Sequence, residues 1–496
     1  MTGQQQAGAT QGRQDAPGPA AFAGGWPAQA GTLARRHWLF AAVLAGAAAL
    51  RAVVMSGYPP AMWFNDSYSY VSSALARSTS TARPGGYPIF LILLEPFHSF
   101  ALVVAVQHLM GLAVGAAIYA LLRRWGLPAW GAVLAAVPVL YDAYQVQVEQ
   151  QIMSDTLFIL LVTAAVVLLC WDDRVAVPVA AAAGLLTGLA TIVRSVGLPL
   201  LAALAVCLLA WRVGWRPLAA LLAAGAVPVA GYLLIFFSQH HQLAMTDSGG
   251  TFLYGRVQTF AQCSVIKPPA PLAGLCDPRA PAQRPVATEY IWRRTDPLWN
   301  LRSHGHLFSP YVNARAKAFA IRAIEAQPLS YLGAVGTDFW RSFAWSRSLA
   351  YDYRTDHLYL FSIPPPQIRF PHYLPVLRAY QPGIGAPRAV QPFAGIARAY
   401  QRQVYLRGTL LGVILLAGLA GVAARWRAGG GPGLLPWLVA ALLLVFPIAV
   451  AGFDYRYLLA VTPLACLAAG LAAARGRRAE AAPAAAPPAR GTATAG

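Results

Sequence analysis

Long apolar runs recur along almost the whole chain, and they constrain its fold more than any other feature. A bilayer-spanning helix needs roughly 20 mostly apolar residues. Ten stretches come close to that length: His37–Val54, His98–Leu122, Leu127–Tyr141, Ser154–Trp171, Val175–Val193, Val196–Trp211, Pro217–Phe237, Leu406–Ala424, Leu434–Val450 and Tyr457–Ala474. Only 11% of the 496 residues are charged, against about a quarter in soluble domains. The sequence therefore predicts an all-α, polytopic membrane protein with ten transmembrane helices.

The apolar runs divide the chain into five parts. Residues 1–34 and 475–496 lack hydrophobic periodicity, and we expect both to be disordered cytoplasmic tails. Between them we expect a transmembrane core over 35–238, an extracytoplasmic region over 239–405, and C-terminal transmembrane helices over 406–474.

Arginine placement orients the helices. With both termini inside and strict alternation, every inward loop carries arginine, as the positive-inside rule requires. Four polar segments then face outside: Met55–Phe97, Asp142–Met153, Gln239–Tyr405 and Ala451–Arg456. Within the first, Tyr87–Pro96 is apolar but too short to span, so we interpret it as an interfacial helix.

The long outer segment is strongly basic, with 18 Lys or Arg against 8 Asp or Glu. Long domains cross the membrane largely regardless of charge. A basic surface there suits an anionic lipid-linked substrate, and ordinary arginine-rich surface remains the alternative. The net charge of +20 is not organised into a basic run interleaved with aromatic residues, so we expect membrane lipids rather than nucleic acid as partners.

The cysteine and histidine residues are not spaced as metal ligands usually are. Cys263 and Cys276 share the long outer segment, where a disulfide can persist, and we predict that they form one. The His304-x-His306 pair lacks nearby carboxylates and is interpreted as a loop feature. No P-loop, Rossmann glycine pattern or GxSxG sequence is present, so we expect no cofactor, and a divalent metal is not indicated.

The first outer loop contains the sequence MWFNDSYSYVSSALARSTSTARPGGYPIFL. Asp66 follows Asn65 at the start of a short amphipathic helix. A carboxylate at the membrane surface can accept the proton of an attacking hydroxyl as a general base. The structural alternative is that Asp66 only caps the helix, and spacing alone leaves both roles open.

The second outer loop offers Glu149 and Asp155. Asp155 stands with Ser154 at the start of an apolar run, where capping and the helix dipole account for an acid without chemistry. Glu149 is surrounded by apolar residues and is a candidate to bind sugar hydroxyls or to position Asp66.

Two arginines stand at the outer ends of apolar runs, Arg194 in TIVRSVGLPL and Arg456 in FDYRYLLAVTPL. Charges at membrane depth are expensive and rare. One interpretation is snorkelling to the lipid headgroups. The other is a clamp on a lipid phosphate, which the guanidinium fork suits. Asp454 is a candidate ion-pair partner of Arg456.

Five of these segments, in order, resemble motifs of the GT-C superfamily of integral-membrane glycosyltransferases. The resemblance is to bacterial relatives of the protein O-mannosyltransferases and the lipid A aminoarabinose transferase. It is carried by NDSYSYVSSA, RPGGYPIFL, VEQQIMSDTLF, RSVGLPL and DYRYLLAVTPL, and it extends from about Leu33 to Ala474.

The resemblance implies a GT-C-like fold and an inverting single displacement at the outer face of the cell membrane. It implies a polyprenyl-phosphate-linked sugar donor and gives Asp66 the role of base. Donor-phosphate binding carries over to Arg194 and Arg456. The remaining substrate-binding candidates are Tyr68, Arg83, Tyr87, Glu149 and Asp155. The acceptor is left open among a glycan, a lipid and a protein.

Two further expectations follow from the resemblance. Many relatives have paired acids in the first loop, whereas Asn65 precedes Asp66 here, which argues against metal-dependent catalysis. The family also suggests a small helical subdomain in the outer region, around Tyr311–Arg341.

Two other functions remain open, a lipid-linked sugar transporter or flippase and a non-enzymatic cell-envelope assembly protein. Transporters place polar sites near the bilayer midplane, often within internal repeats, whereas these apolar runs are nearly free of acids and show no repeat. An enzyme should bring Asp66 within reach of Arg194 or Arg456 around a cavity.

Overall fold

The computed structural model describes residues 26–347, 357–366 and 370–474. These residues form helices joined by loops, and within them the only strand-like pairing is an isolated parallel bridge between Met62 and Gln151. The predicted tail at 475–496 lies outside the described residues, as does most of the tail at 1–34. The first helix begins at Trp26, so residues 26–34 are helical, not part of a tail as predicted.

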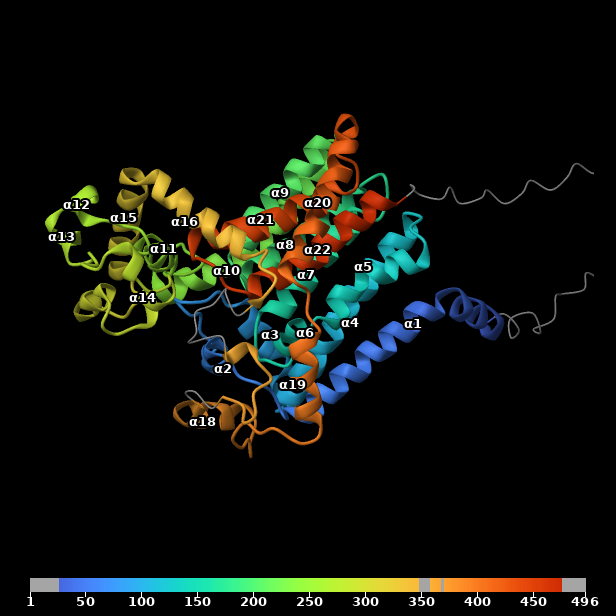
Figure 1. Ribbon diagram of the computed structural model, residues 1–496, viewed down its shortest axis with the longest axis horizontal. Coiled ribbons are helices and arrows are strands. Elements are labelled where there is room, and N and C mark those ends of the chain that lie inside the picture. Colours follow the sequence, from blue (N-terminus) through green and yellow to red (C-terminus); the bar gives the residue numbers. More distant parts are fainter. Residues whose placement is uncertain (1–25, 348–356, 367–369, 475–496) are drawn as a thin grey trace, which may run out of the picture.

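A bundle of apolar helices makes up the larger part of the molecule (Figure 1). Each of the ten predicted runs corresponds to one helix of this bundle. These helices are α1 (Trp26–Gly57), α4 (Phe100–Arg124), α5 (Ala129–Tyr141), α7 (Asp155–Leu169), α8 (Val177–Val193), α9 (Gly197–Ala210), α10 (Trp215–His240), α20 (Gly408–Ala424), α21 (Leu434–Val450) and α22 (Arg456–Ala473).

Among the residues that the structure describes, four helices are long and apolar enough to cross a membrane: α1 from His37, α4, α10 and α22. The helix α19 (Phe393–Gln403) and α20 form a fifth span if the pair, bent by 58°, counts as one. The other apolar helices of the bundle have 13 to 17 residues. A helix of 13 residues is only about 20 Å long, less than the hydrocarbon core of about 30 Å. The number of ten spans therefore stays a prediction.

Short helices connect the bundle helices at the first two predicted outer loops. They are α2 (Asn65–Ala76), α3 (Gly86–Leu94) and α6 (Ala143–Glu149). Helix α3 matches the predicted helix at Tyr87–Pro96. It packs closely against the end of α8, because a Cβ atom on Gly86 would lie 2.7 Å from the backbone of Ile192. This contact brings the first loop beside Arg194, the residue that follows α8.

The region 239–405 contains a helical unit with its own hydrophobic core. Its helices are α11 (Gly249–Gln258), α12 (Cys263–Ile266), α13 (Ala270–Ala273), α14 (Glu289–Trp292), α15 (Pro310–Ala326) and α16 (Pro328–Arg341). The subdomain expected around Tyr311–Arg341 corresponds to α15 and α16. The core includes Tyr254, Tyr290 and Phe319. The predicted disulfide between Cys263 and Cys276 is confirmed.

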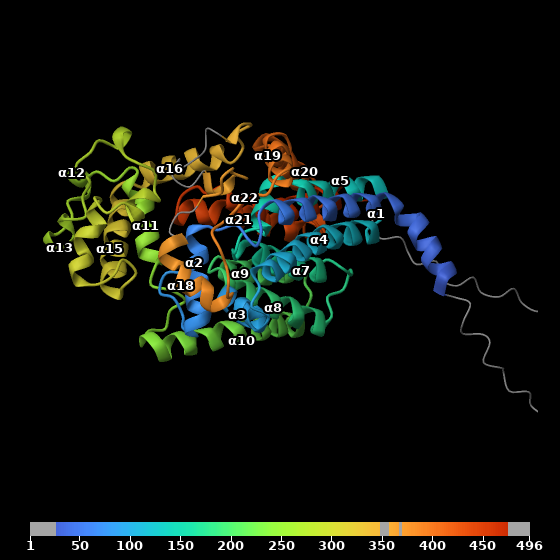
Figure 2. The same ribbon diagram turned by 90° about the horizontal axis from the view of Figure 1, so that it is seen from below.

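The remaining helices are α18 (Phe370–Tyr380), beside α2, and α19, beside α1. Short 3₁₀ helices also occur: η2 (Glu95–Phe97), η3 (Pro281–Gln283), η4 (Pro297–His304), η6 (His357–Tyr359) and η7 (Trp426–Ala428). Two views show α11 to α15 at one end of the molecule, whereas the start of α1 and the end of α22 lie toward the other (Figures 1 and 2).

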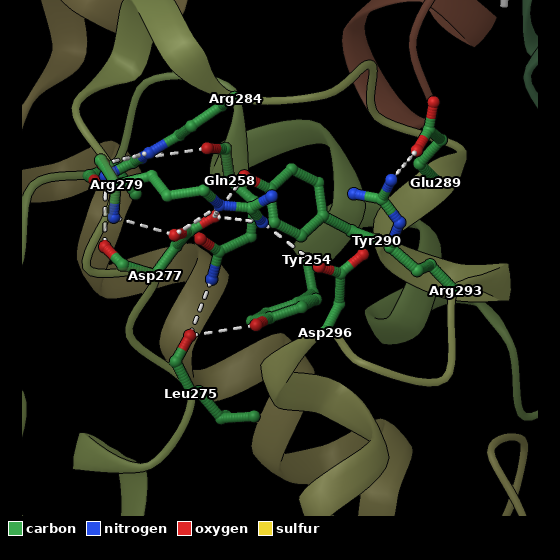
Figure 3. A network of polar contacts seen from close by, with 11 residues as sticks. Tyr254, Gln258, Leu275, Asp277, Arg279, Arg284, Glu289, Tyr290, Arg293 and Asp296 are labelled. Carbon is green, nitrogen blue, oxygen red and sulfur yellow. Dashed lines mark hydrogen bonds and ion pairs between the residues drawn. The ribbon is translucent and has the colours of Figure 1, made fainter.

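A polar network supports the helical unit from within (Figure 3). Arg279 binds two acids, with its Nη2 atom 2.6 Å from Asp277 and 3.0 Å from Asp296. Tyr290 donates its hydroxyl to Asp277. One arginine therefore serves two buried carboxylates in this part of the molecule.

Candidate functional site

Asp66 lies in the first turn of α2, between two arginines that reach it from distant parts of the chain. Its Oδ1 atom accepts a hydrogen bond from Nη2 of Arg83 at 2.8 Å, and its Oδ2 atom accepts one from Nη1 of Arg456 at 3.0 Å. Arg83 precedes α3, and Arg456 is the first residue of α22. The N-cap position of α2 is Phe64, whose N–H donates to Ser67 Oγ. The side chain of Asp66 therefore pairs with arginines instead of capping its helix.

The charge state of Asp66 follows from these neighbours. Burial alone would raise the pKa of this carboxyl, because only 7% of the residue is exposed. The guanidinium groups of Arg83 and Arg456 outweigh burial and lower the pKa to about 2. Asp66 is therefore an anion at any physiological pH.

Arg194 and Asp155 form a second ion pair beside the first. Arg194 follows α8, and Asp155 begins α7. The guanidinium carbon of Arg194 also lies 5.8 Å from the ring centre of Phe158 and 5.6 Å from that of Tyr457, within the usual range of cation–π contacts. Asp155 thus does more than begin a helix, because it fixes an arginine.

These groups meet at a cavity of about 180 Å³, which we call the Asp66 cavity. Asp66, Arg83, Arg194 and Arg456 all line it. Polar or aromatic walls come from Tyr70, Ser154, Thr246, Ser248, Phe252 and Tyr457, and one apolar wall comes from Phe446, Pro447 and Val450 of α21. Three arginines and one aspartate at a partly apolar pocket form an environment suited to an anion with a hydrophobic tail.

Further side chains hold Arg456 in place. Its Nε atom lies 3.1 Å from a carboxylate oxygen of Asp454, and the hydroxyl of Tyr359 donates to the other oxygen at 2.8 Å. The ring of Phe64 lies 5.2 Å from the guanidinium carbon. The pairing of Asp454 with Arg456 was predicted, whereas the contacts of Tyr359 with Asp454 and of Phe64 with Arg456 were not.

Besides Asp155, which contacts Arg194 but does not itself line the Asp66 cavity, three predicted site residues lie away from it. Glu149 is fully buried, with its carboxylate bound by Arg51 at 2.8 Å and by His108 at 2.9 Å. Tyr68 stacks on Tyr373, with 4.8 Å between ring centres.

The hydroxyl of Tyr87, the third of these residues, donates to Gln107 Oε1 at 2.6 Å. The short helix α6 turns Glu149 toward α1 and α4, and the packing of α2 and α3 buries the two tyrosines. All three positions were predicted to bind substrate, and the structure instead places them in internal contacts.

Other cavity residues were missed by the sequence analysis. Tyr70 is four residues after Asp66, a spacing that places both on one helix face, so helical periodicity could have found it. Its hydroxyl lies 3.1 Å from Ser154 Oγ. Thr246, Ser248 and Phe252 come from the start of the region 239–405 and carry no sequence signal that links them to the first loop.

Across 26–347, 357–366 and 370–474, no three His, Cys, Asp or Glu side chains come together as a metal site would require. Both oxygens of Asp66 are bound by arginine.

Comparison with known proteins gives only distant similarity. No protein-family model matches the sequence, and no curated protein matches it. The chain is similar to two crystal structures of ArnT from Cupriavidus metallidurans, one bound to undecaprenyl phosphate and one in the apo state. Each is 12% identical, covers 88% of this chain and 78% of its own, and has a TM-score of 0.37 or 0.35. Similarity at this level does not establish a shared activity, so the chemistry of the cavity rests on its own residues.

Proposed function

We propose that this protein is a membrane glycosyltransferase that moves a sugar from a polyprenyl phosphate to an acceptor hydroxyl. The observation that carries the proposal is the Asp66 cavity, where one ionised carboxylate stands between Arg83 and Arg456, with Arg194 on the same wall. A phosphate that bears both a sugar and a long apolar chain combines the charge and the hydrophobic character that this pocket would complement.

The proposed reaction is a single displacement. The acceptor oxygen attacks the anomeric carbon of the sugar, and its proton passes to the carboxylate of Asp66. The bond from that carbon to the phosphate oxygen breaks, and its electron pair stays on the leaving phosphate. Arginines at the leaving group stabilise the negative charge that grows there, and the carboxylate accepts the proton released on the other side. Attack opposite the leaving group inverts the anomeric centre.

The arginines also connect donor binding to base strength. Without a donor, both oxygens of Asp66 accept N–H groups, and a carboxylate with a pKa of about 2 is a weak base. A donor phosphate would compete for those N–H groups and neutralise the cations. The pKa of Asp66 would then rise, because burial continues to disfavour its charge. Under this scheme Asp66 becomes an effective base only when the donor is bound.

We place the reaction at the outer face of the cell membrane. Two observations support this orientation. The arginine alternation assigns the first two polar loops to the outside. The disulfide between Cys263 and Cys276 is typical of an oxidising compartment, and the helical unit that holds it adjoins the Asp66 cavity through Ser248 and Phe252.

The decisive experiment is a transfer assay with the purified chain and a panel of polyprenyl-phosphate sugars. We expect at least one donor to release polyprenyl phosphate, with the sugar inverted in the product. A parallel vesicle assay follows movement of the same donors across the bilayer. Movement without any release of polyprenyl phosphate by folded protein would contradict the enzyme proposal and favour the transporter.

A further inference from the structure

A second cavity lies between the helical unit and the loop that precedes α22. We call it the Arg256 cavity, and it has a volume of about 280 Å³. Arg256 of α11 and Thr337, Asp338 and Arg341 of α16 line it, together with residues 284–288. Phe453 closes one side. None of these residues belongs to the Asp66 cavity.

Arginine exceeds acid in the lining of this cavity. Three arginines line it, Arg256, Arg284 and Arg341, together with one carboxylate, that of Asp338. Both oxygens of Asp338 are used, because Oδ2 lies 2.7 Å from Nη1 of Arg256 and Oδ1 lies 2.8 Å from Nη1 of Arg341. Two arginines thus share one acid.

The guanidinium group of Arg256 is buried, and part of it has no hydrogen-bond partner among the described residues. Only 2% of it is exposed, and its Nε and Nη2 atoms have no acceptor among the described residues. Buried donors normally have a partner, because an unmade hydrogen bond to a desolvated group is costly. Burial also lowers the pKa of Arg256 below its usual range despite the nearby Asp338.

The neighbouring network has the opposite imbalance of charge. There the ratio is reversed, since Arg279 serves both Asp277 and Asp296. Arg284 stands between the two sets and donates to backbone carbonyls, including that of Gln258 at 2.9 Å (Figure 3). The described ion pairs include no carboxylate for Arg284. Arg284 offsets the extra acid of that network, and Arg256 and Arg341 against Asp338 leave one positive charge in excess at the Arg256 cavity.

We propose that the Arg256 cavity binds an anionic group, a phosphate or a carboxylate. A guanidinium group presents N–H donors in a planar fork that matches the oxygens of either anion. This proposal stands on the Arg256 cavity alone and is independent of the reaction assigned to Asp66.

The test is site-specific thiol labelling of the full-length chain with inorganic phosphate as the probe. Thr337→Cys places a thiol in the cavity wall at an exposed position, and Ser330→Cys places one at an exposed position of α16 outside the cavity. The free native cysteines Cys170, Cys207 and Cys466 are buried, so the background is low. Phosphate at ten times its Kd should slow labelling of the Thr337→Cys thiol about tenfold by mass action. Labelling of the Ser330→Cys thiol should not change.

Arginine variants in the Thr337→Cys background decide whether this cavity holds the anion. Arg341→Gln should abolish protection and should fold, because the Arg341 side chain is 45% exposed. Arg322→Gln removes an exposed arginine of α15 outside the cavity and should leave protection intact.

Reconstitution identifies the source of the anion. Labelling is measured in nanodiscs of phosphatidylcholine with and without phosphatidylglycerol, in a buffer that contains no inorganic phosphate. The comparison shows whether a lipid headgroup fills the site. Protection by phosphatidylglycerol, or by phosphate alone, supports the proposal and names the source. Equal labelling in phosphate and in chloride of the same ionic strength, or protection that survives Arg341→Gln, would overturn it.

Discussion

Asp66 and Glu149 are both buried carboxylates bound by arginine, but only Asp66 faces a cavity. Asp66 stands between Arg83 and Arg456 at the cavity wall. Glu149 is enclosed by Arg51 of α1 and His108 of α4. Burial raises the pKa of each carboxyl, and the adjacent cations lower it by more, so both acids are ionised. Burial, pairing and charge state therefore do not distinguish a site from a structural cluster. What distinguishes Asp66 is that it lines a cavity where further cations also lie.

The strongest test of this comparison is Asp66→Asn. Loss of a general base typically lowers turnover by about 10²–10⁴-fold, and we expect a loss of that size in sugar transfer. Asparagine keeps the shape of the side chain, so donor binding should remain. Donor binding and transfer are measured on the same membrane-inserted protein. Near-normal turnover would show that Asp66 is not the base. Asp66 and Glu149 would then both be structural carboxylates.

The matched test is Glu149→Gln, which should affect stability instead of chemistry. Removing one partner of a buried ion pair costs about 3–5 kcal/mol, because the other charge stays buried and unpaired. Denaturant unfolding in detergent should show this loss, and turnover per folded molecule should stay near the native value. The double variant Arg51→Met, Glu149→Leu removes both charges and should recover much of the stability. A large fall in turnover by folded Glu149→Gln would place Glu149 in the reaction after all.

A smaller effect is expected from the cations of the cavity. Hydrogen bonds to charged groups contribute about 1.5–3 kcal/mol, so Arg194→Gln should weaken binding of the lipid donor by about 10- to 100-fold. Arg77→Gln is the control, since Arg77 pairs with Glu95 at an exposed position of the same first loop and does not line the cavity. Equal affinities of the two variants would show that Arg194 only snorkels.

The pH dependence of the free energy of unfolding should show the smallest of these effects. The ordinary pKa of an aspartate is about 3.9, and that of Asp66 is lowered to about 2. The ion pairs of Asp66 with Arg83 and Arg456 therefore stabilise the fold above about pH 4. Their contribution to the free energy of unfolding disappears as the pH falls through 2.

The free protein and the donor complex should differ in the acid limb of their rate profiles. The kcat/KM profile reports the free protein and should show no acid limb from Asp66 above about pH 4. The kcat profile reports the complex and should show an acid limb at higher pH, because the donor phosphate occupies the arginines. Identical acid limbs in the two profiles would contradict the link between donor binding and base strength.

The sequence predicts the helices of this fold better than their membrane topology. Each apolar run forms a helix, because the runs carry the composition that helices in lipid require. The number of spans does not follow, because α5 and α9 are too short to be assigned by length and α20 is bent against α19. In the region 239–405 the family resemblance suggests a helical subdomain that corresponds to α15 and α16, whereas short helices such as α12 and α13 leave no periodic pattern.

The candidate site divides in the same way. The ends of apolar runs and the first loop correctly suggested that Asp66 and Arg456 would meet, and Asp155 proved to hold Arg194. The position of Glu149 away from the Asp66 cavity was not predicted, because a sequence shows which loop an acid occupies and not the direction in which a short helix turns it. Phe252 was missed because its contribution depends on how the helical unit docks, a long-range contact without a local signal.

The loop Ala451–Arg456 has a consequence for regulation. Ala451 and Arg456 line the Asp66 cavity, and Phe453, between them in sequence, lines the Arg256 cavity. This stretch of six residues thus contributes side chains to the linings of both cavities. An occupant of one cavity that displaced this stretch would alter the lining of the other cavity. Thermodynamic reciprocity then requires that whatever factor an anion applies to the affinity for the lipid donor, the donor applies to the affinity for the anion.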